Sequence, residues 1–147
     1  EKRKEITTEG GLNLKKNKKF IEKIIKSLNK KGIRVSLFLE PKINDIKYAK
    51  YLGAKCVELH TGNFCNLLNK GKKTKKSYIN LKKTANFAKK IGLEVHAGHG
   101  LTYKSAHLIS KIKSITEFNI GHFIISESLF YGMTNIVSKF KKIIKIR

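Results

Sequence analysis

Amphipathic helical segments and short apolar runs alternate along this chain, and this alternation limits the fold more than any other feature. Apolar runs of strand length are found at 33–39, 56–60, 93–97 and 118–120. Apolar residues at helical spacing are found at 17–31, 43–52, 78–91, 105–112 and 124–146. Parallel strands need helical crossovers between them, so the sequence predicts an α/β fold with a parallel sheet. We expect the lysine-rich stretch 61–77 to be a loop.

Two architectures fit this alternation: an open doubly wound sheet, or part of a (βα)₈ TIM barrel. A complete barrel needs about 250 residues, whereas the chain has 147. The chain therefore holds about four βα units, roughly half the strands of a barrel. Hydrophobic residues make up 40% of the chain, which is typical of a globular domain with a core.

The formal net charge of +23 limits the partners of the chain. Its lysines are spread through nearly every segment and are not interleaved with aromatic residues on one strand face, as RNA stacking requires. We therefore expect small phosphorylated substrates and no specific nucleic acid. No run approaches the roughly 20 apolar residues of a membrane span, so we expect no membrane partner. The two cysteines do not suggest a disulfide framework, so a reducing cytoplasm is the expected location.

A glycine-flanked histidine follows the third apolar run. Gly98, His99 and Gly100 lie between this run and the next helical segment. The two glycines lack Cβ atoms, so the backbone can turn sharply and approach an anion closely. An unperturbed histidine side chain changes charge near neutral pH, which makes His99 a natural candidate for a proton carrier. The alternative is a tight turn in which His99 only hydrogen-bonds to the backbone.

Four of the five histidines follow or end predicted strands, namely His60, His96, His99 and His122, while His107 lies on a helical segment. The carboxyl ends of parallel strands form the edge where barrels and doubly wound sheets build their active sites. Random placement would put more histidines on helix surfaces. The clustering therefore favours a functional site at this edge.

Glu58 is the second candidate for catalysis. The period of two along a strand places Cys56, Glu58 and His60 on one face of the sheet. A carboxylate inside a strand is costly to bury unless it is paired or used. The alternatives are a structural ion pair with a lysine, or an acid, base or charge-stabilising group at the mouth of the barrel.

Gly121 and His122 end the fourth strand and begin a helical segment. A glycine at such a position presents free N–H groups and the positive end of a helix to a phosphate. Barrels often build a phosphate site from their last two βα loops. Here these would be the loops at 98–100 and 121–122.

A zinc site is the main rival interpretation for these residues. His96 and His99, together with Glu58 and His60, could supply the ligands. However, His96 and His99 are separated across a strand end, which gives no fixed helical face for both rings. We therefore expect no metal ion, and we expect no cofactor.

The chain closely resembles the pyridoxine 5′-phosphate synthase family in six segments that follow the family's order and approximate spacing. These segments are 1–3, 7–11, 34–38, 58–62, 97–101 and 119–122. The resemblance implies a (βα)₈ barrel, assembled as a homo-octamer. It also implies a transferase that condenses 3-amino-2-oxopropyl phosphate with 1-deoxy-D-xylulose 5-phosphate in vitamin B6 biosynthesis, with release of phosphate and water.

The resemblance also implies a role for each matching residue. His99 looks like the proton donor, and Glu58 looks like the carboxylate that stabilises the transition state. Thr7 would contact the deoxyxylulose phosphate. The aminooxopropyl phosphate would be held by Gly100, Gly121 and His122. Two departures from the family pattern are His96, where many members carry Asn, and Glu40, where Asp is common.

By the same resemblance, residues 1–147 match the C-terminal part of a single barrel domain. The family's first strands, which carry a catalytic histidine and a catalytic glutamate base, would precede Glu1. We therefore expect that these residues alone neither close a barrel nor catalyse the full reaction. The alternative to a synthase is a truncated, non-catalytic remnant that binds phosphate.

Overall fold

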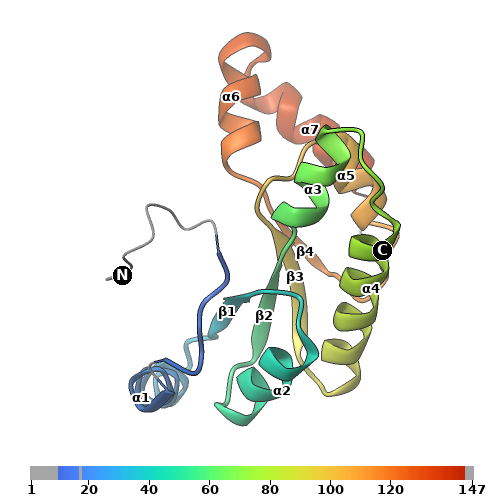
Figure 1. The fold of residues 1–147 in the computed structure, drawn as a ribbon. Helices are drawn as coiled ribbons and strands as arrows, with labels where there is room; N and C mark the ends of the chain where they lie inside the picture. Colours follow the sequence, from blue (N-terminus) through green and yellow to red (C-terminus); the bar gives the residue numbers. More distant parts are fainter. Residues whose placement is uncertain (1–9, 17, 145–147) are drawn as a thin grey trace.

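The structure, a computed structural model, describes residues 10–16 and 18–144. In this part of the chain, strands alternate with helices (Figure 1). The strands are β1 (Ser36–Leu39), β2 (Cys56–His60), β3 (Glu94–Gly98) and β4 (Glu117–Asn119). The helices are α1 (Lys18–Lys30), α2 (Ile43–Tyr51), α3 (Gly62–Asn69), α4 (Lys75–Lys90), α5 (Tyr103–Ile109), α6 (His122–Tyr131) and α7 (Met133–Ile143).

The strands form one parallel sheet in the order β1-β2-β3-β4, which confirms the predicted fold class. In the register, Glu58 lies between Phe38 on β1 and His96 on β3, and His96 in turn lies beside Glu117 on β4. These residues therefore form one row across the sheet. In the described part of the chain, β1 and β4 are the two edges, and the N–H of Leu12 donates to the carbonyl of Phe38 at 2.8 Å beside β1.

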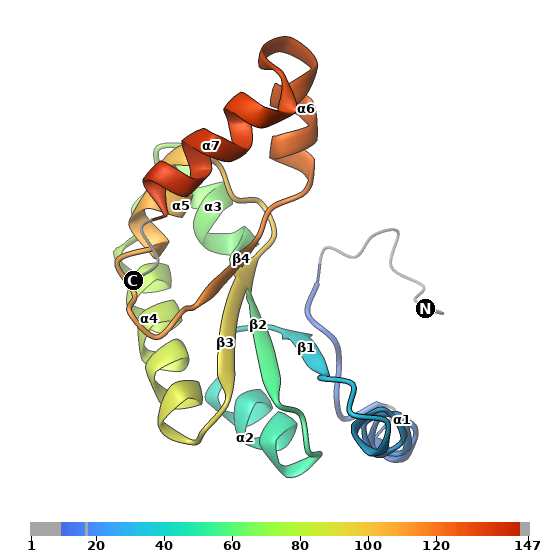
Figure 2. The same cartoon turned by 180° about the vertical axis from the view of Figure 1, so that it is seen from behind.

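The two faces of the sheet differ in chemistry. One face carries buried Leu39, Leu59 and Val95, which belong to the core cluster together with apolar side chains of α2 and α4. Figure 2 shows α4 running along the sheet, and α4 contacts β2 and β3. The other face carries the polar row. Alternation of apolar and polar residues along each strand therefore aims one set of side chains at the helices and the other set away from them.

The prediction of a loop over 61–77 is wrong, because this stretch contains α3 and the start of α4. Phe64 and Cys65 are buried in the core, and Leu68 packs against it. These residues repeat at helical spacing, and their burial stabilises a helix that the surrounding lysines obscure in the sequence. The true connection is confined to 70–74.

The helical spacing of apolar residues from 124 onward corresponds to two helices, because Gly132 separates α6 from α7. Gly132 has φ +77° and ψ 140°, a conformation that is nearly restricted to glycine. The helix therefore breaks, and α7 turns back to pack against α5 (Figure 1). Its buried Ile136 and Phe140 form a second small core with Ala106.

Replacing Gly132 by alanine should destabilise the chain by about 1–3 kcal/mol, because alanine is strained at this φ and ψ. Urea unfolding followed by circular dichroism measures the change. Gly121→Ala is the matched control, since Gly121 has φ −102° and a Cβ there would meet no atom within 4 Å. Equal stability of the two variants would contradict the assigned break between α6 and α7.

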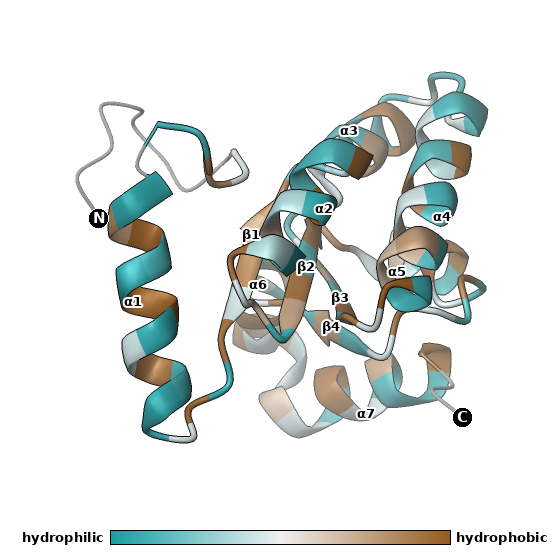
Figure 3. Cartoon of the chain, turned by 90° about the horizontal axis from the view of Figure 1, so that it is seen from below, coloured by the Kyte–Doolittle hydropathy of each residue, from teal (hydrophilic) through white to brown (hydrophobic). Residues whose placement is uncertain are grey.

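Helix α6 is apolar on several sides. Leu129 and Phe130 are 81% and 80% exposed, and Ile125 is also exposed. Figure 3 shows apolar colour on several helices, but each apolar stretch is short. Within residues 10–16 and 18–144, no helix combines the length and apolar character needed to cross a bilayer.

Candidate active site at the carboxyl edge of the sheet

A groove of about 810 Å³ lies at the carboxyl ends of the strands. Five residues that the sequence proposes for the site line it, namely Glu58, His99, Gly100, Gly121 and His122. The sixth, Thr7, lies outside the described residues. The fold thus brings together residues that are far apart in the sequence, while their individual roles remain predictions.

Glu58 lies on β2 and faces the ends of β3 and β4. Its Oε2 accepts a hydrogen bond of 2.7 Å from Nδ2 of Asn119. A Cβ on Gly98 would overlap Oε1 of Glu58, so only glycine at position 98 leaves room for this carboxylate. Burial raises the pKa of Glu58 above its usual value, although the Asn119 hydrogen bond and the charge of His96 oppose the rise. The carboxyl group is therefore held in place and is a weaker acid than a solvated glutamate.

His99 has a strained backbone. It is the non-glycine residue with a positive φ among those the structure describes, at +75°, and Gly100 follows with φ +75°. A left-handed conformation costs a residue other than glycine about 1–3 kcal/mol, so the surroundings must hold it. Such strain is concentrated at functional sites. The tight turn expected at 98–100 is therefore present, and the His99 side chain lines the groove.

The ring of His99 is stacked on that of His60. Their centroids are 4.7 Å apart with an interplanar angle of 26°. A Cβ on Gly62 would lie 2.7 Å from Cε1 of His60 and 2.9 Å from Cδ2 of His99, so glycine at this position permits the stack. Nδ1 of His60 lies 3.4 Å from Oε1 of Glu40, which also accepts a 3.2 Å hydrogen bond from the N–H of Gly11. The ring of His99 in the groove thus packs against the ring of a second, buried histidine, His60.

Gly121 and His122 lie at the start of α6. Gly121 is the N-terminal cap, and no side chain accepts a hydrogen bond at this cap. The first N–H groups of a helix lack partners within the helix. Because both residues are exposed and line the groove, these N–H groups are positioned to receive an anion there.

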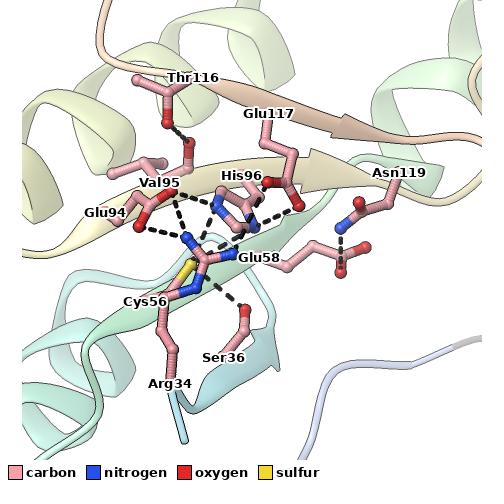
Figure 4. A network of polar contacts seen from close by, with 10 residues as sticks. All are labelled: Arg34, Ser36, Cys56, Glu58, Glu94, Val95, His96, Thr116, Glu117 and Asn119. Carbon is pink, nitrogen blue, oxygen red and sulfur yellow. Dashed lines mark hydrogen bonds and ion pairs between the residues drawn. The ribbon is translucent and has the colours of Figure 1, made fainter. Parts of the chain in front are cut away.

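His96 does not lie at the edge, contrary to the sequence-based expectation, because it sits in the middle of β3. It is 2% exposed, and Nε2 lies 3.0 Å from Oε1 of Glu94 while Nδ1 lies 3.2 Å from Oε1 of Glu117. Arg34 donates to both oxygens of Glu94 at 2.7 and 2.6 Å. Figure 4 shows these side chains pointing toward one another beside Cys56, with Glu58 to one side of them. They form an ionic network deeper in the sheet than the groove.

Residues 1–146 match the protein family described as "Pyridoxal phosphate biosynthesis protein PdxJ". The chain belongs to the PdxJ family.

Relatives of this PdxJ chain carry the name pyridoxine 5′-phosphate synthase. The protein of Pelagibacter ubique is 59% identical over 143 residues, which are 97% of this chain and 60% of the relative. That of Sulfurihydrogenibium is 45% identical over 144 residues, 98% of this chain and 58% of the relative. That of Desulfatibacillum aliphaticivorans is 43% identical over 139 residues, 95% of this chain and 57% of the relative. The PdxJ chain thus spans less than two thirds of the length of these relatives.

The zinc site weighed for the PdxJ sequence is not assembled in the described residues. His99 stacks on His60 at the edge, whereas His96 faces the network. The group with metal-ligand spacing is instead Cys56, Glu94 and His96. There the sulfur of Cys56 lies at nearly equal distances, 3.2 and 3.4 Å, from the two ring nitrogens of His96, so it is not directed at the lone pair of one nitrogen. The carboxylate of Glu94 is already paired with Arg34. The arrangement fits a hydrogen-bonded ion network better than a metal centre.

Sequence reasoning on this PdxJ chain missed Asn119 and Phe38, which also line the groove. Asn119 reaches Glu58 because β4 is aligned so that Asn119 lies beside Gly98. The position of Asn119 at the end of a short apolar run was the available signal. The register across two strand pairs, which decides the contact, is not visible in one sequence.

The ionic network makes the stability of this PdxJ chain depend on pH. Hydrogen bonds from His96 and Arg34 lower the pKa of Glu94. A carboxyl group with a lowered folded-state pKa contributes stability above its unfolded-state pKa of about 4.3 and loses it as the pH falls through the folded value. Arg34→Gln should therefore lower the urea midpoint at pH 7, and the difference should shrink as the pH falls below about 4.

Lys26→Gln is the control for the Arg34 substitution. Lys26 pairs with Glu22 one turn away on α1, where both side chains meet solvent, and we expect a smaller effect. A loss for Arg34→Gln that is equal at pH 7 and pH 3 would show that Arg34 acts through packing and not through Glu94.

Proposed function

We propose that this chain is the C-terminal part of a pyridoxine 5′-phosphate synthase. The observation that carries the proposal is the groove at the carboxyl edge, where Glu58, His99 and the start of α6 meet. The proposed reaction condenses 3-amino-2-oxopropyl phosphate with 1-deoxy-D-xylulose 5-phosphate and releases phosphate and water. The proposal includes a homo-octameric, cytoplasmic enzyme that needs no metal ion or cofactor.

The proposed architecture is a (βα)₈ barrel, with 1–147 as its later part. Parallel sheets are usually covered on both faces, but here the core helices cover one face and the other carries ionised side chains. A closed barrel accommodates such a face in its interior. The contact of Leu12 with Phe38 supports a preceding strand beside β1. At this place a Cβ on Gly11 would overlap the backbone of Leu39 and Glu40, so glycine permits the close approach.

The proposed roles follow the chemistry of the groove. Ring closure by imine formation and dehydration needs repeated proton transfers, and His99 supplies a proton donor there. Glu58, fixed by Asn119, stabilises positive charge that develops in the transition state. Gly100 and the N–H groups at Gly121 and His122 hold the aminooxopropyl phosphate. Thr7 contacts the deoxyxylulose phosphate.

The test is to join this chain to the part of the Pelagibacter ubique relative that lies outside the match. Formation of pyridoxine 5′-phosphate from the two substrates is measured for this fusion and for the 147-residue chain alone. We expect activity from the fusion and none from the chain alone. Activity of the chain alone would overturn the proposal that it is only part of the catalytic unit. An inactive but folded fusion that binds inorganic phosphate would favour the non-catalytic remnant.

A further inference from the structure

Thr61 is a buried threonine at the start of α3 whose hydroxyl does not cap that helix. Its exposed fraction is 0%, and it occupies the N-terminal cap position without a side-chain hydrogen bond to a backbone N–H of the helix. Its Oγ1 accepts a hydrogen bond of 3.6 Å from Sγ of Cys65 on α3. Threonine at this position normally accepts a hydrogen bond from an N–H of the first turn. The hydroxyl of Thr61 is instead directed at the end of β3.

The hydroxyl of Thr61 lies within hydrogen-bond distance of two successive carbonyl groups. Its Oγ1 is 2.8 Å from the carbonyl oxygen of Gly98 and 2.6 Å from that of His99. Its backbone N–H also donates to the Gly98 carbonyl at 2.9 Å. The hydrogen bond from the backbone N–H of Thr61 to the Gly98 carbonyl continues the pairing of β2 with β3. The contact with the His99 carbonyl, in contrast, is made only by the side-chain hydroxyl of Thr61.

These contacts involve the carbonyl groups on both sides of the strained residue. His99 has φ +75°, a conformation that side chains other than glycine avoid, and the direction of its ring follows from its backbone. The hydroxyl of Thr61 connects α3 to this backbone from a distance of 38 residues in the sequence. Removal of the hydroxyl would take away its contact with the His99 carbonyl, so the left-handed backbone of His99 would lose one of the groups that hold it.

We propose that Thr61 is a positioning residue for His99. Its hydroxyl holds the left-handed backbone of His99 and thereby aims the imidazole into the groove and onto His60. The catalytic role of the imidazole rests on the proposed function. The statement that the Thr61 hydroxyl holds the backbone of His99 does not depend on that function. Thr61 acts through His99 and does not line the groove among the residues described.

The experiment compares Thr61→Val with Thr61→Ser in the fusion used to test the function. Valine keeps the shape and the backbone N–H of threonine but lacks the hydroxyl, whereas serine retains the hydroxyl. A misplacement of about 1 Å costs on the order of 10²-fold in rate, so Thr61→Val should lower kcat about 10²-fold with KM changed less than about 3-fold. Thr61→Ser, which keeps the hydroxyl, should retain a kcat within about 3-fold of that of the unsubstituted fusion.

A second readout separates this inference from the proposed function. The ring resonances of His99 in the 147-residue chain are followed by NMR in both variants, with those of exposed His107 as an internal reference. We expect the His99 signals to shift in Thr61→Val and to return toward their original positions in Thr61→Ser. If the fusion is inactive but these shifts occur, the proposed function fails and the positioning role stands. If both variants lose kcat equally, or His99 is unmoved in Thr61→Val, the positioning role is overturned.

Discussion

Replacing His99 by asparagine in the active fusion should lower kcat by about 10²–10⁴-fold, the usual contribution of a positioned proton donor. Asparagine is chosen because it tolerates a positive φ better than other side chains, so the backbone at 98–100 is retained. The substitution therefore removes the titratable ring with little change in the turn. The rate of pyridoxine 5′-phosphate formation at saturating substrate measures the effect.

The matched control is His107→Asn, which removes an exposed histidine from α5. We expect its kcat to stay within about 3-fold of the unsubstituted fusion, because surface substitutions away from special sites change little. The pH profile gives a further check, since the limb that reports the proton donor should disappear only in His99→Asn. Unchanged turnover in His99→Asn would remove His99 from the proposed mechanism.

Replacing Gly98 by alanine should disable Glu58 without touching its carboxyl group. The added Cβ would overlap Oε1 of Glu58 and lie 3.2 Å from Cβ of Asn119, so the carboxylate must leave its position. We expect a stability loss of about 1–3 kcal/mol from this overpacking, and a fall in kcat on the order of 10²-fold from the displaced group. Urea unfolding and turnover of the fusion measure the two effects.

The double variant Gly98→Ala, Glu58→Ala identifies the cause of the loss. Truncating Glu58 removes the overlap, so the double variant should recover stability relative to Gly98→Ala while remaining inactive. The two substitutions are in contact, and a coupling of about 0.5–3 kcal/mol is expected for such pairs. Additive stability losses would mean that the alanine at 98 strains something other than Glu58.

Local sequence patterns predicted the main features of the fold because each depends on neighbouring residues. The period of two from Cys56 to His60 is sufficient to define β2, and its bounds agree with the structure. The glycines around His99 predict a sharp turn, which the structure contains. Helices ending near Gly53 and Gly92 follow from the same kind of local signal.

The errors come from interactions between distant parts of the chain. Helix α3 contains no lysine and is stabilised because Phe64 packs into the core, but the lysines that follow it at 70–76 make the whole stretch look like a polar loop. His96 was placed at the edge because it precedes the turn, but it is held inside β3 by Glu94 and Glu117 from two strands. The roles of Asn119 and Thr61 depend on strand register and on backbone carbonyls, which a single sequence does not encode visibly.

The two edges of the sheet are unequal, and this has a consequence for the isolated chain. Beside β1, Leu12 already occupies a carbonyl of the edge, whereas in the described residues β4 pairs only with β3. An edge strand with free N–H and C=O groups is a template for pairing with another chain. Self-association of the 147-residue chain should therefore begin at β4, and a proline at Phe118, in the middle of this strand, should suppress it. Aggregation in storage would then add strands mainly beside β4, because the backbone at Leu12 blocks part of the β1 edge.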